Sequence, residues 1–498
     1  MYKQVKFTVD MKRLSAAEIA TAVSGELYGV DPETKLSAGV VTDSREVGPG
    51  DIYVARRGES FDGIEFAAAA VEAGAALIIG ESVPTLDDAT LPTVLVSDAT
   101  EALGQLAKCN IEALREVGEI TVIAITGSVG KTTVKDLAAD LLAGEAETVW
   151  PPNSYNNEVG VPLTALRAGE STRFLVLEMG ARSIGNLAYL TSLVRPDIAV
   201  ELAVGTAHSG VFGSIENTAR AKAELVESLT AGSVAILNAD DSRVAGMREV
   251  LSPEVDTLWF SQRESLPEWV AEEDSVVRGT GVTTDASGHA AFSLDLPGEE
   301  PQDVRLALIG EHHVGNALAS AAIAHACGVG VKSIVTTLST SSAASRWRME
   351  LIDSPSGVTV LNDAYNANPE SMRASLKTLA SMGRGDEDSR PRRTFAVLGE
   401  MLELGDESIS AHSDIGELVV RLNITRTIVV GEGAKPIFNA ANLEGSWGNE
   451  AAWVPTAAEA KDLLSAELAP GDIVLFKSSR DAGLRYLGDE IAGVSGAQ

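Results

Sequence analysis

Short apolar runs and amphipathic stretches alternate along the chain, and the alternation is most regular after residue 120. Apolar runs of strand length lie at residues 174–178, 198–204 and 234–238, and stretches with helical periodicity separate them. Strands that are apolar at consecutive positions are covered on both faces, as in a parallel sheet between helices. The pattern therefore predicts an α/β domain that opens with a strand at Thr121.

The segments on either side of this regular stretch have different patterns. Before it, we expect short helices and strands at 16–23, 64–73, 76–79, 93–96 and 101–117. From 257 to 308, short strands and turns predict an antiparallel excursion, and a helix over 314–327 closes the domain. After a small polar stretch that we interpret as a hinge, at 341–345, further strands are expected at 358–362, 394–399, 427–431 and 472–477.

These patterns predict an α/β protein of three domains. The first is a small mixed α/β N-terminal domain over 1–118, and the second is a central P-loop mononucleotide-binding domain with a parallel sheet over 119–344. The third is a C-terminal Rossmann-like α/β domain over 345–498. The length of 498 residues agrees, because a single core rarely serves a chain this long.

Charge, apolar runs and cysteine content limit the binding partners and the location that we expect for this protein. The formal net charge is −32, and no basic stripe interrupts the acidic background, so we expect no nucleic-acid partner. No run approaches the length of a membrane span and the N-terminus lacks a signal pattern, so we expect no membrane partner. With only Cys109 and Cys327 in the chain, a cytoplasmic location is predicted.

The segment after Thr121 carries the strongest chemical signal. A β-type run leads into a glycine loop and then a helix, with the loop and helix start formed by Gly127, Ser128, Val129, Gly130, Lys131, Thr132 and Thr133. Backbone N–H groups of such a loop face a phosphate, the lysine reaches its outer oxygens, and the following threonine can hold Mg²⁺. A plain glycine turn with a surface lysine is the alternative, but the strand before and the helix after favour ATP binding.

Polar side chains gather where later strands end. Glu178 ends one predicted strand and His208 follows another, at the edge where a parallel sheet presents its ligands, and both are natural Mg²⁺ ligands. Asn156 and Asn157 lie in an amide-rich loop after the first helix, and indicate contacts to phosphate or substrate. Lys222, in a helical stretch, would by itself be a surface lysine.

The chain resembles the Mur ligases, an ATP-dependent family that forms amide bonds, over nearly its whole length from about Met11. The most specific of the residues that carry the resemblance is the segment Asp363-Ala-Tyr-Asn-Ala-Asn-Pro369. The others are Asp43-Ser-Arg45, Gly50-Asp51, Phe61-Asp-Gly63, Thr126 to Thr133, Asn156-Asn-Glu158, Glu178, Gly205-Thr-Ala-His208, Lys222, Gly310, His312, Asn316, Arg348-Met-Glu350, Leu398 to Gly405, His412, Lys477 and Arg480.

The resemblance implies an activity and a role for each matching residue. UDP-N-acetylmuramoyl-tripeptide and D-Ala-D-Ala would be the substrates, with ATP and Mg²⁺ required and an acyl phosphate as the intermediate. Asp43, Ser44 and Arg45 would lie near the nucleotide sugar, while His312, Asn316, Arg348 and Asp363 would contact ATP. Thr132 would hold one Mg²⁺. Glu178 and His208 would hold a second Mg²⁺, which a carbamylated Lys222 would support. The catalytic residues would be Lys131, Lys222 and His208. Lys477 and Arg480 would help place the substrates near the reacting centre.

Two positions depart from the family pattern, and several alternatives stay open. His313 stands where the family often has Asn, and Ser478 stands where it usually has Gly. Rival activities are the ligases adding diaminopimelate or lysine, a folylpolyglutamate synthase, and an ATP-driven switch or assembly protein. Whether the tripeptide carries diaminopimelate or lysine is open, as is the oligomeric state, although a monomer suits three domains that close on one site.

Overall fold

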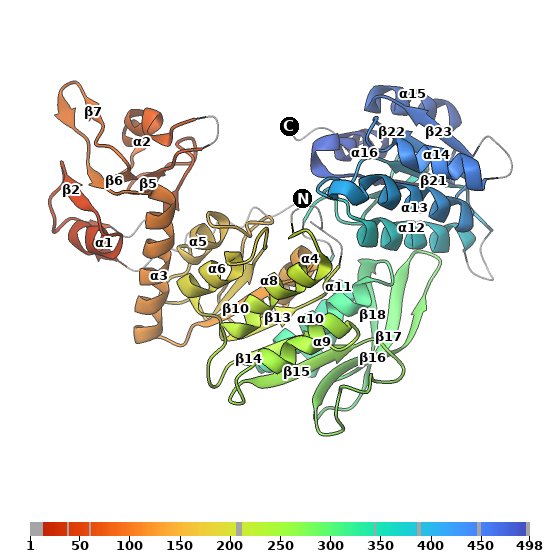
Figure 1. Ribbon diagram of the computed structural model, residues 1–498, viewed down its shortest axis with the longest axis horizontal. Coiled ribbons are helices and arrows are strands. Elements are labelled where there is room, and N and C mark those ends of the chain that lie inside the picture. Colours follow the sequence, from red (N-terminus) through yellow and green to blue (C-terminus); the bar gives the residue numbers. More distant parts are fainter. Residues whose placement is uncertain are drawn as a thin grey trace.

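The computed structural model describes residues 13–36, 39–58, 61–205, 212–342, 345–385, 390–445 and 450–494. Three lobes follow one another from the N-terminus to the C-terminus across the longest dimension of the molecule (Figure 1). Each lobe is built on its own sheet: five-stranded, nine-stranded and six-stranded in chain order. The α/β fold class expected from the sequence is confirmed.

The N-terminal lobe has a mixed five-stranded sheet with the order β2-β9-β6-β5-β4. Its strands are β2 (Glu26–Tyr28), β4 (Val40–Val41), β5 (Ile52–Ala55), β6 (Leu77–Gly80) and β9 (Thr93–Leu95). Two small ladders join β1 (Leu14–Ser15) to β3 (Lys35–Leu36) and β7 (Thr85–Leu86) to β8 (Ala89–Thr90). The helices are α1 (Ala16–Ala22), the 3₁₀ turn η1 (Gly63–Phe66), α2 (Ala67–Ala73) and α3 (Ala99–Val117).

The central lobe is a nine-stranded sheet with the order β11-β12-β10-β13-β14-β15-β16-β17-β18. The strands are β10 (Thr121–Thr126), β11 (Thr148–Val149), β12 (Phe174–Glu178), β13 (Ile198–Glu201), β14 (Val234–Asn238), β15 (Asp256–Ser261), β16 (Ser275–Thr284), β17 (His289–Asp295) and β18 (Gln302–Ile309). Its helices are α4 (Lys131–Ala143), α5 (Gly160–Ala165), α6 (Asn186–Val194), α8 (Ile215–Glu227), α9 (Ser242–Gly246), η2 (Met247–Val250), α10 (His313–Ala326) and α11 (Val331–Thr340).

The C-terminal lobe carries the six-stranded sheet β19-β20-β24-β21-β22-β23, parallel except for β19. The strands are β19 (Glu350–Asp353), β20 (Thr359–Asn362), β21 (Thr394–Leu398), β22 (Arg426–Val430), β23 (Ala451–Val454) and β24 (Ile473–Lys477). Its helices are α12 (Pro369–Arg384), η3 (Gly405–Glu407), α13 (Ser408–Arg421), α14 (Lys435–Glu444), α15 (Ala457–Glu467), η4 (Arg480–Ala482) and α16 (Leu484–Ala492).

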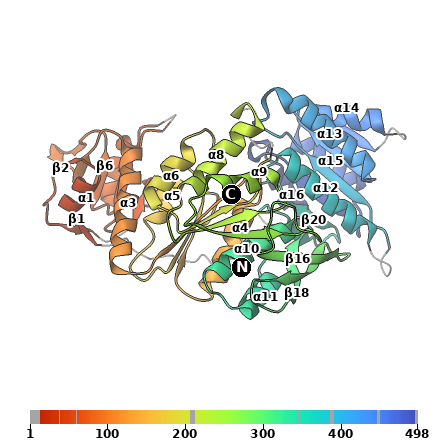
Figure 2. The ribbon, with the colours of Figure 1, turned by 60° about the horizontal axis from the view of Figure 1, so that its bottom comes forward.

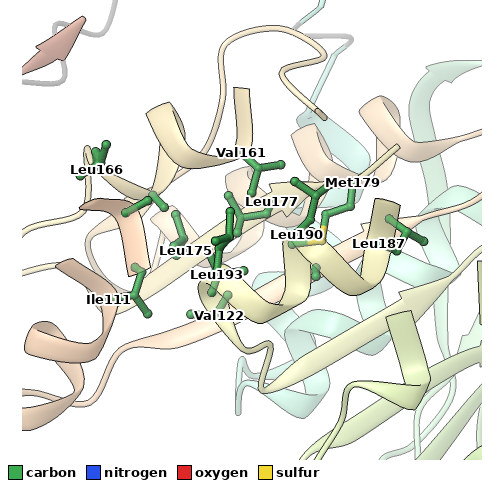
Figure 3. Close-up of a cluster of buried hydrophobic side chains, with 14 of the residues drawn as sticks. Ile111, Val122, Val161, Leu166, Leu175, Leu177, Met179, Leu187, Leu190 and Leu193 are labelled. Carbon is green, nitrogen blue, oxygen red and sulfur yellow. The ribbon is translucent and has the colours of Figure 1, made fainter. Parts of the chain in front are cut away.

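The N-terminal and central lobes share one hydrophobic core. Helix α3 packs on β5 and β6 of the first sheet and also on α5 and α6 of the second. Figure 3 shows the junction, where Ile111 of α3 lies with Leu175, Leu177 and Leu193 of the central lobe. A view turned by 60° also places α3 between the two lobes (Figure 2). The C-terminal lobe instead has two cores, one on each face of its sheet, and Ile309 at the end of β18 is the one central-lobe residue among their buried members.

Some expected elements differ from those observed. Strand β15 pairs in parallel with both β14 and β16, so residues 256–261 extend the parallel sheet, and the antiparallel part begins with the β16–β17 pair. Helix α10 does not close the domain, because α11 follows it. Strand β13 ends at Glu201, three residues before the expected end. In the described parts of the chain, no helix combines the length and apolar character that a membrane crossing requires.

Candidate active site

The phosphate loop lies at the C-terminal tip of β10, in the middle of the central sheet. Gly127 and Gly130 have φ angles of 155° and 86°, which a residue with a side chain adopts only at a cost. A Cβ at Gly130 would lie 2.4 Å from Asn316 Oδ1, so a side chain there would also displace the Asn316 amide. Lys131 begins α4 and its Nζ donates to Gly127 O at 2.6 Å, with its pKa lowered by burial. Strand, loop and helix are arranged as the sequence predicted.

Glu178 joins the loop through a compact polar network. Thr132 Oγ1 donates to Glu178 Oε2 at 2.7 Å, and the hydroxyls of Thr132 and Ser154 are 2.9 Å apart. Asn156 Nδ2 donates to the other carboxylate oxygen of Glu178 at 2.8 Å. Hydroxyl and carboxylate oxygens are the donor set that Mg²⁺ prefers, so Thr132, Ser154 and Glu178 fit that cation. Sequence reasoning missed Ser154, which had only its place in the amide-rich loop to mark it.

The two asparagines of that loop have different tasks. Asn156 binds Glu178 with its side chain, and its carbonyl accepts from Gly180 N at 2.8 Å. The side-chain oxygen of Asn157 instead accepts from the backbone N–H of Gly160 at 3.0 Å, where α5 begins. Asn157 lines the same cavity as the phosphate loop, but this oxygen is committed to the turn. A substrate contact of Asn157 stays a prediction.

Lys222 is not a surface lysine. It is 4% exposed on α8, and burial and the charge of Lys131 lower its pKa. Glu201, at the tip of β13, is fully buried and its pKa is raised by burial. Neither carboxylate oxygen of Glu201 has a hydrogen-bond partner among the described residues. A single acid inside the otherwise apolar run 198–204 was the available signal for Glu201, and sequence reasoning did not use it.

One of the residues predicted to bind Mg²⁺ lies outside the part of the chain that the structure describes. His208 lies outside the described residues, so its expected place beside Glu178 stays a prediction. Within the described ranges, no three His, Cys, Asp or Glu side chains converge on a point. Lys222 could join a cation site only after conversion of its amine to an anion, as the expected carbamylation would do.

The start of helix α10 presents two neighbouring histidines and an amide to the same region. The rings of His312 and His313 are 4.2 Å apart, and Asn316 Nδ2 lies 3.0 Å from His313 Nδ1. Burial lowers the pKa of His312 to about 4 and also holds the pKa of His313 well below its usual value, so both rings are neutral near pH 7. His312 and Asn316 thus lie beside the phosphate loop, as expected for residues that contact a nucleotide.

The C-terminal lobe contributes a second group of side chains. Arg348 Nη2 donates to Ser154 Oγ at 3.1 Å, and its guanidinium lies 4.3 Å from the centre of the Tyr365 ring. Lys477 Nζ donates to Asp363 Oδ2 at 2.7 Å and to Asn366 O at 3.0 Å. Sequence reasoning named Arg348, Asp363 and Lys477 but missed Tyr365, although the residue lies inside the most specific motif.

Most of these residues line one cavity of about 720 Å³ between the central and C-terminal lobes. Its walls include Lys131, Glu178 and Lys222 on one side and Arg348 and Arg480 on the other. The three predicted residues of the N-terminal lobe, Asp43, Ser44 and Arg45, do not line it. There the guanidinium of Arg45 binds Asp43 at 2.5 Å and lowers the pKa of that carboxyl to about 2.

Comparisons with known proteins agree over almost the whole chain. Family models match residues 37–110 (Mur ligase family, catalytic domain), 125–324 (Mur ligase middle domain) and 347–480 (Mur ligase, glutamate ligase domain). A UDP-N-acetylmuramoyl-tripeptide–D-alanyl-D-alanine ligase from Mycobacterium leprae is 40% identical, over 96% of this chain and 98% of its own. The enzyme of the same name from Escherichia coli is 32% identical over 95% and 97%.

Solved structures give the same result. MurF from Acinetobacter baumannii superposes with a TM-score of 0.83 at 30% identity, covering 97% of this chain and 99% of its own. MurF ligase from Thermotoga maritima, in complex with ADP, superposes with a TM-score of 0.75 at 27% identity over 92% and 97%. The chain therefore belongs to the Mur ligase family, in the branch of its UDP-N-acetylmuramoyl-tripeptide–D-alanyl-D-alanine ligases.

Proposed function

We propose that this protein uses ATP to join D-Ala-D-Ala to the terminal carboxylate of UDP-N-acetylmuramoyl-tripeptide. ADP, phosphate and the pentapeptide precursor of peptidoglycan are the products. The observation that carries the proposal is a phosphate loop that faces Arg348 and Lys477 of another lobe across one cavity. Full-length identity to ligases of this name supports the choice of substrates.

A carboxylate must first be activated, because an amine does not displace oxide from it. Transfer of the γ-phosphoryl group of ATP to the carboxylate gives an acyl phosphate and ADP. Negative charge is spread over the phosphoryl oxygens during transfer, and Lys131 with the loop N–H groups would stabilise it. A Mg²⁺ ion held by Thr132, Ser154 and Glu178 would add Lewis-acid stabilisation of the same oxygens.

The amine of D-Ala-D-Ala then attacks the acyl carbon, and the tetrahedral intermediate expels phosphate. An acyl phosphate hydrolyses in open water, so the walls contributed by the C-terminal lobe protect it. Arg348 crosses the boundary between lobes to Ser154 and brings positive charge to the phosphate side. Arg480 lies on the same wall and would orient substrate. Lys477 would act through Asp363 and Asn366, to which its ammonium donates. None of these steps needs a side-chain nucleophile.

Further roles follow from the same proposal. Asp43, Ser44 and Arg45 would bind the UDP end, and His312 with Asn316 would contact the adenine. Lys222 would react with CO₂ as a neutral amine, which its lowered pKa favours, to give a carbamate that supports the cation. Intact mass of the CO₂-equilibrated protein tests this, and an unmodified lysine would contradict it. Consumption of ATP and a UDP-linked precursor would place the reaction in the cytoplasm, and a monomer would suffice for it.

The decisive experiment measures ADP release with Mg·ATP and UDP-N-acetylmuramoyl-tripeptide, with and without D-Ala-D-Ala. We expect release that requires both acceptor and dipeptide, together with a pentapeptide product of the correct mass. ADP release that ignores both would refute the ligase assignment and favour an ATP-driven switch. Replacing the dipeptide with single amino acids separates this ligase from the amino-acid-adding members of the family.

A further inference from the structure

The first turns of α4 carry two buried charges that the proposed chemistry does not use. Lys135 is fully buried and Asp136 is 9% exposed, and Lys135 Nζ lies 2.6 Å from Asp136 Oδ1. Burying a lysine is costly, and an apolar pair of similar size is often as stable as a buried ion pair. Their placement one turn beyond Lys131 therefore suggests a task other than stability.

Lys135 holds the amide-rich loop, residues 151–157, at its first residue. Its Nζ donates to Pro151 O at 2.7 Å. At the other end of the loop, Asn156 O accepts from Gly180 N at 2.8 Å. Between these two anchors lies Ser154, whose hydroxyl is 2.9 Å from Thr132 Oγ1. The position of Ser154 beside the phosphate loop thus depends on the reach of Lys135.

Asp136 holds the segment that enters the C-terminal lobe. Its Oδ2 accepts from Ser345 Oγ at 2.6 Å, while Oδ1 faces Lys135. Three residues beyond Ser345, Arg348 reaches back to Ser154 Oγ at 3.1 Å. The backbone on either side of Arg348 is constrained, since Trp347 before it and Met349 after it have φ angles of 61° and 50°. The direction of Arg348 thus depends on the anchor at Ser345.

These contacts form a closed ring. From Ser154 the loop backbone leads to Pro151, whose carbonyl accepts from Lys135. Lys135 pairs with Asp136, and Asp136 accepts from Ser345. From Ser345 the backbone leads to Arg348, which donates to Ser154. We propose that Lys135 and Asp136 are positioning residues that set Ser154 and Arg348 against each other, so that the C-terminal lobe delivers its arginine only to a correctly built nucleotide site. The inference rests on the proposed function for the contact of Arg348 with nucleotide.

The test uses Mg·ADP binding to the full-length protein, measured by titration calorimetry. Ser345→Ala removes one hydroxyl, and we expect about fivefold weaker binding because the anchor of Arg348 is lost. Ser345→Thr keeps the hydroxyl and should bind within twofold of wild type. Lys135→Met combined with Asp136→Leu removes both charges together, so no single charge is left buried, and should weaken binding at least as much.

The decisive comparison is a cycle between the two sites. In the Lys135→Met, Asp136→Leu background, Ser345→Ala should have no further effect, because its partner is already gone. A full fivefold loss of Mg·ADP affinity on adding Ser345→Ala to that background would overturn the proposal. Wild-type affinity in the single variant Ser345→Ala would also overturn it. So would equal losses of affinity in Ser345→Ala and Ser345→Thr. Since the readout is nucleotide binding, a wild type that binds Mg·ADP but makes no pentapeptide would refute the proposed function and leave this test intact.

Discussion

Individual side chains at this site are tuned by burial more than by ion pairs. Lys131, Lys222, His312 and His313 all have pKa values lowered by removal from water. The phosphate-loop motif identified Lys131, and the resemblance to the Mur ligases alone identified Lys222 and His312. Their electrostatics could not be predicted, because pKa shifts depend on neighbours that only the fold brings together, such as Glu201 beside the α8 lysine.

Replacing the phosphate-loop lysine tests the charge argument most directly. Lys131→Ala should reduce the rate of pentapeptide synthesis by at least about 100-fold, since one positioned donor to a developing charge is worth that much. Steady-state phosphate release reports the loss. Lys461→Ala, which removes an exposed lysine paired with Glu490, serves as the control and should be neutral. A Lys131→Ala enzyme as fast as wild type would refute the role.

His312 should make stability depend on pH. Its pKa is about 4 in the folded protein against 6.5 for the free side chain. The unfolded chain therefore binds a proton below pH 6.5 that the folded protein takes up only near pH 4. The contribution of neutral His312 to the free energy of unfolding is fully present above pH 6.5 and is lost as the pH falls toward 4. Urea unfolding at pH 7.0 and 5.0 should show a smaller difference for His312→Gln than for wild type; equal differences would contradict the assignment.

At the scale of elements, the predicted strands and helices were right where hydrophobic periodicity was strong. Residues 174–178 and 234–238 are strands with the expected bounds. The prediction of strand pairing was wrong where one apolar pattern is compatible with both a parallel and an antiparallel neighbour. Strand β15 looks alike in a parallel or an antiparallel pair, and its partners are chosen by the twist and packing of the whole sheet. The strand β23 was missed because three of its four residues are only partly buried.

The junction of the phosphate loop with α10 predicts an outcome at the same scale. Gly130→Ala introduces a Cβ at φ 86° and 2.4 Å from Asn316 Oδ1, so both backbone strain and a clash result. Gly232→Ala is a matched control, with φ 81° and no atom within 4 Å of the new Cβ. We expect Gly130→Ala to lower the free energy of unfolding by about 1 kcal/mol more than the control and to weaken Mg·ADP binding.

Equal unfolding free energies for the two alanine variants would show that the contact with Asn316 relaxes at no cost. Calorimetric titration of both variants with Mg·ADP then separates a local effect on the loop from a general loss of stability. The Gly232→Ala variant should bind the nucleotide as wild type does, because the residue lies in the turn before β14, away from the cavity.

For the whole molecule, the sequence predicted the class and the family, but not how the lobes share their cores. Domain boundaries read from patterns suggest three independent units. The structure shows one continuous hydrophobic cluster through the first two lobes, because the single broad apolar stripe of α3 packs on β5 and β6 and also on α5 and α6. The elements that pack against this stripe are determined by tertiary structure. The periodicity of one helix predicts that the stripe is buried, but not which elements cover it.

The net charge of −32 should oppose the approach of anionic substrates. Raising NaCl from 20 to 150 mM screens this repulsion, so kcat/KM for the UDP-linked substrate should increase severalfold. D-Ala-D-Ala carries no net charge at pH 7, so its kcat/KM, measured at saturating nucleotide, should change little. A fall in kcat/KM for the anionic substrate over this range would mean that local Lys and Arg residues dominate the field instead.

The shared core at α3 fixes more than the fold. Because the N-terminal and central lobes share one hydrophobic core, we expect the span from Asp43 and Arg45 to the phosphate loop to stay nearly the same when the C-terminal lobe moves. Under the proposed function, this span would select substrates by length. A UDP-linked peptide held near Asp43 and Arg45 would be activated only if its far carboxylate reached Lys131, and a peptide one residue short would bind without being activated.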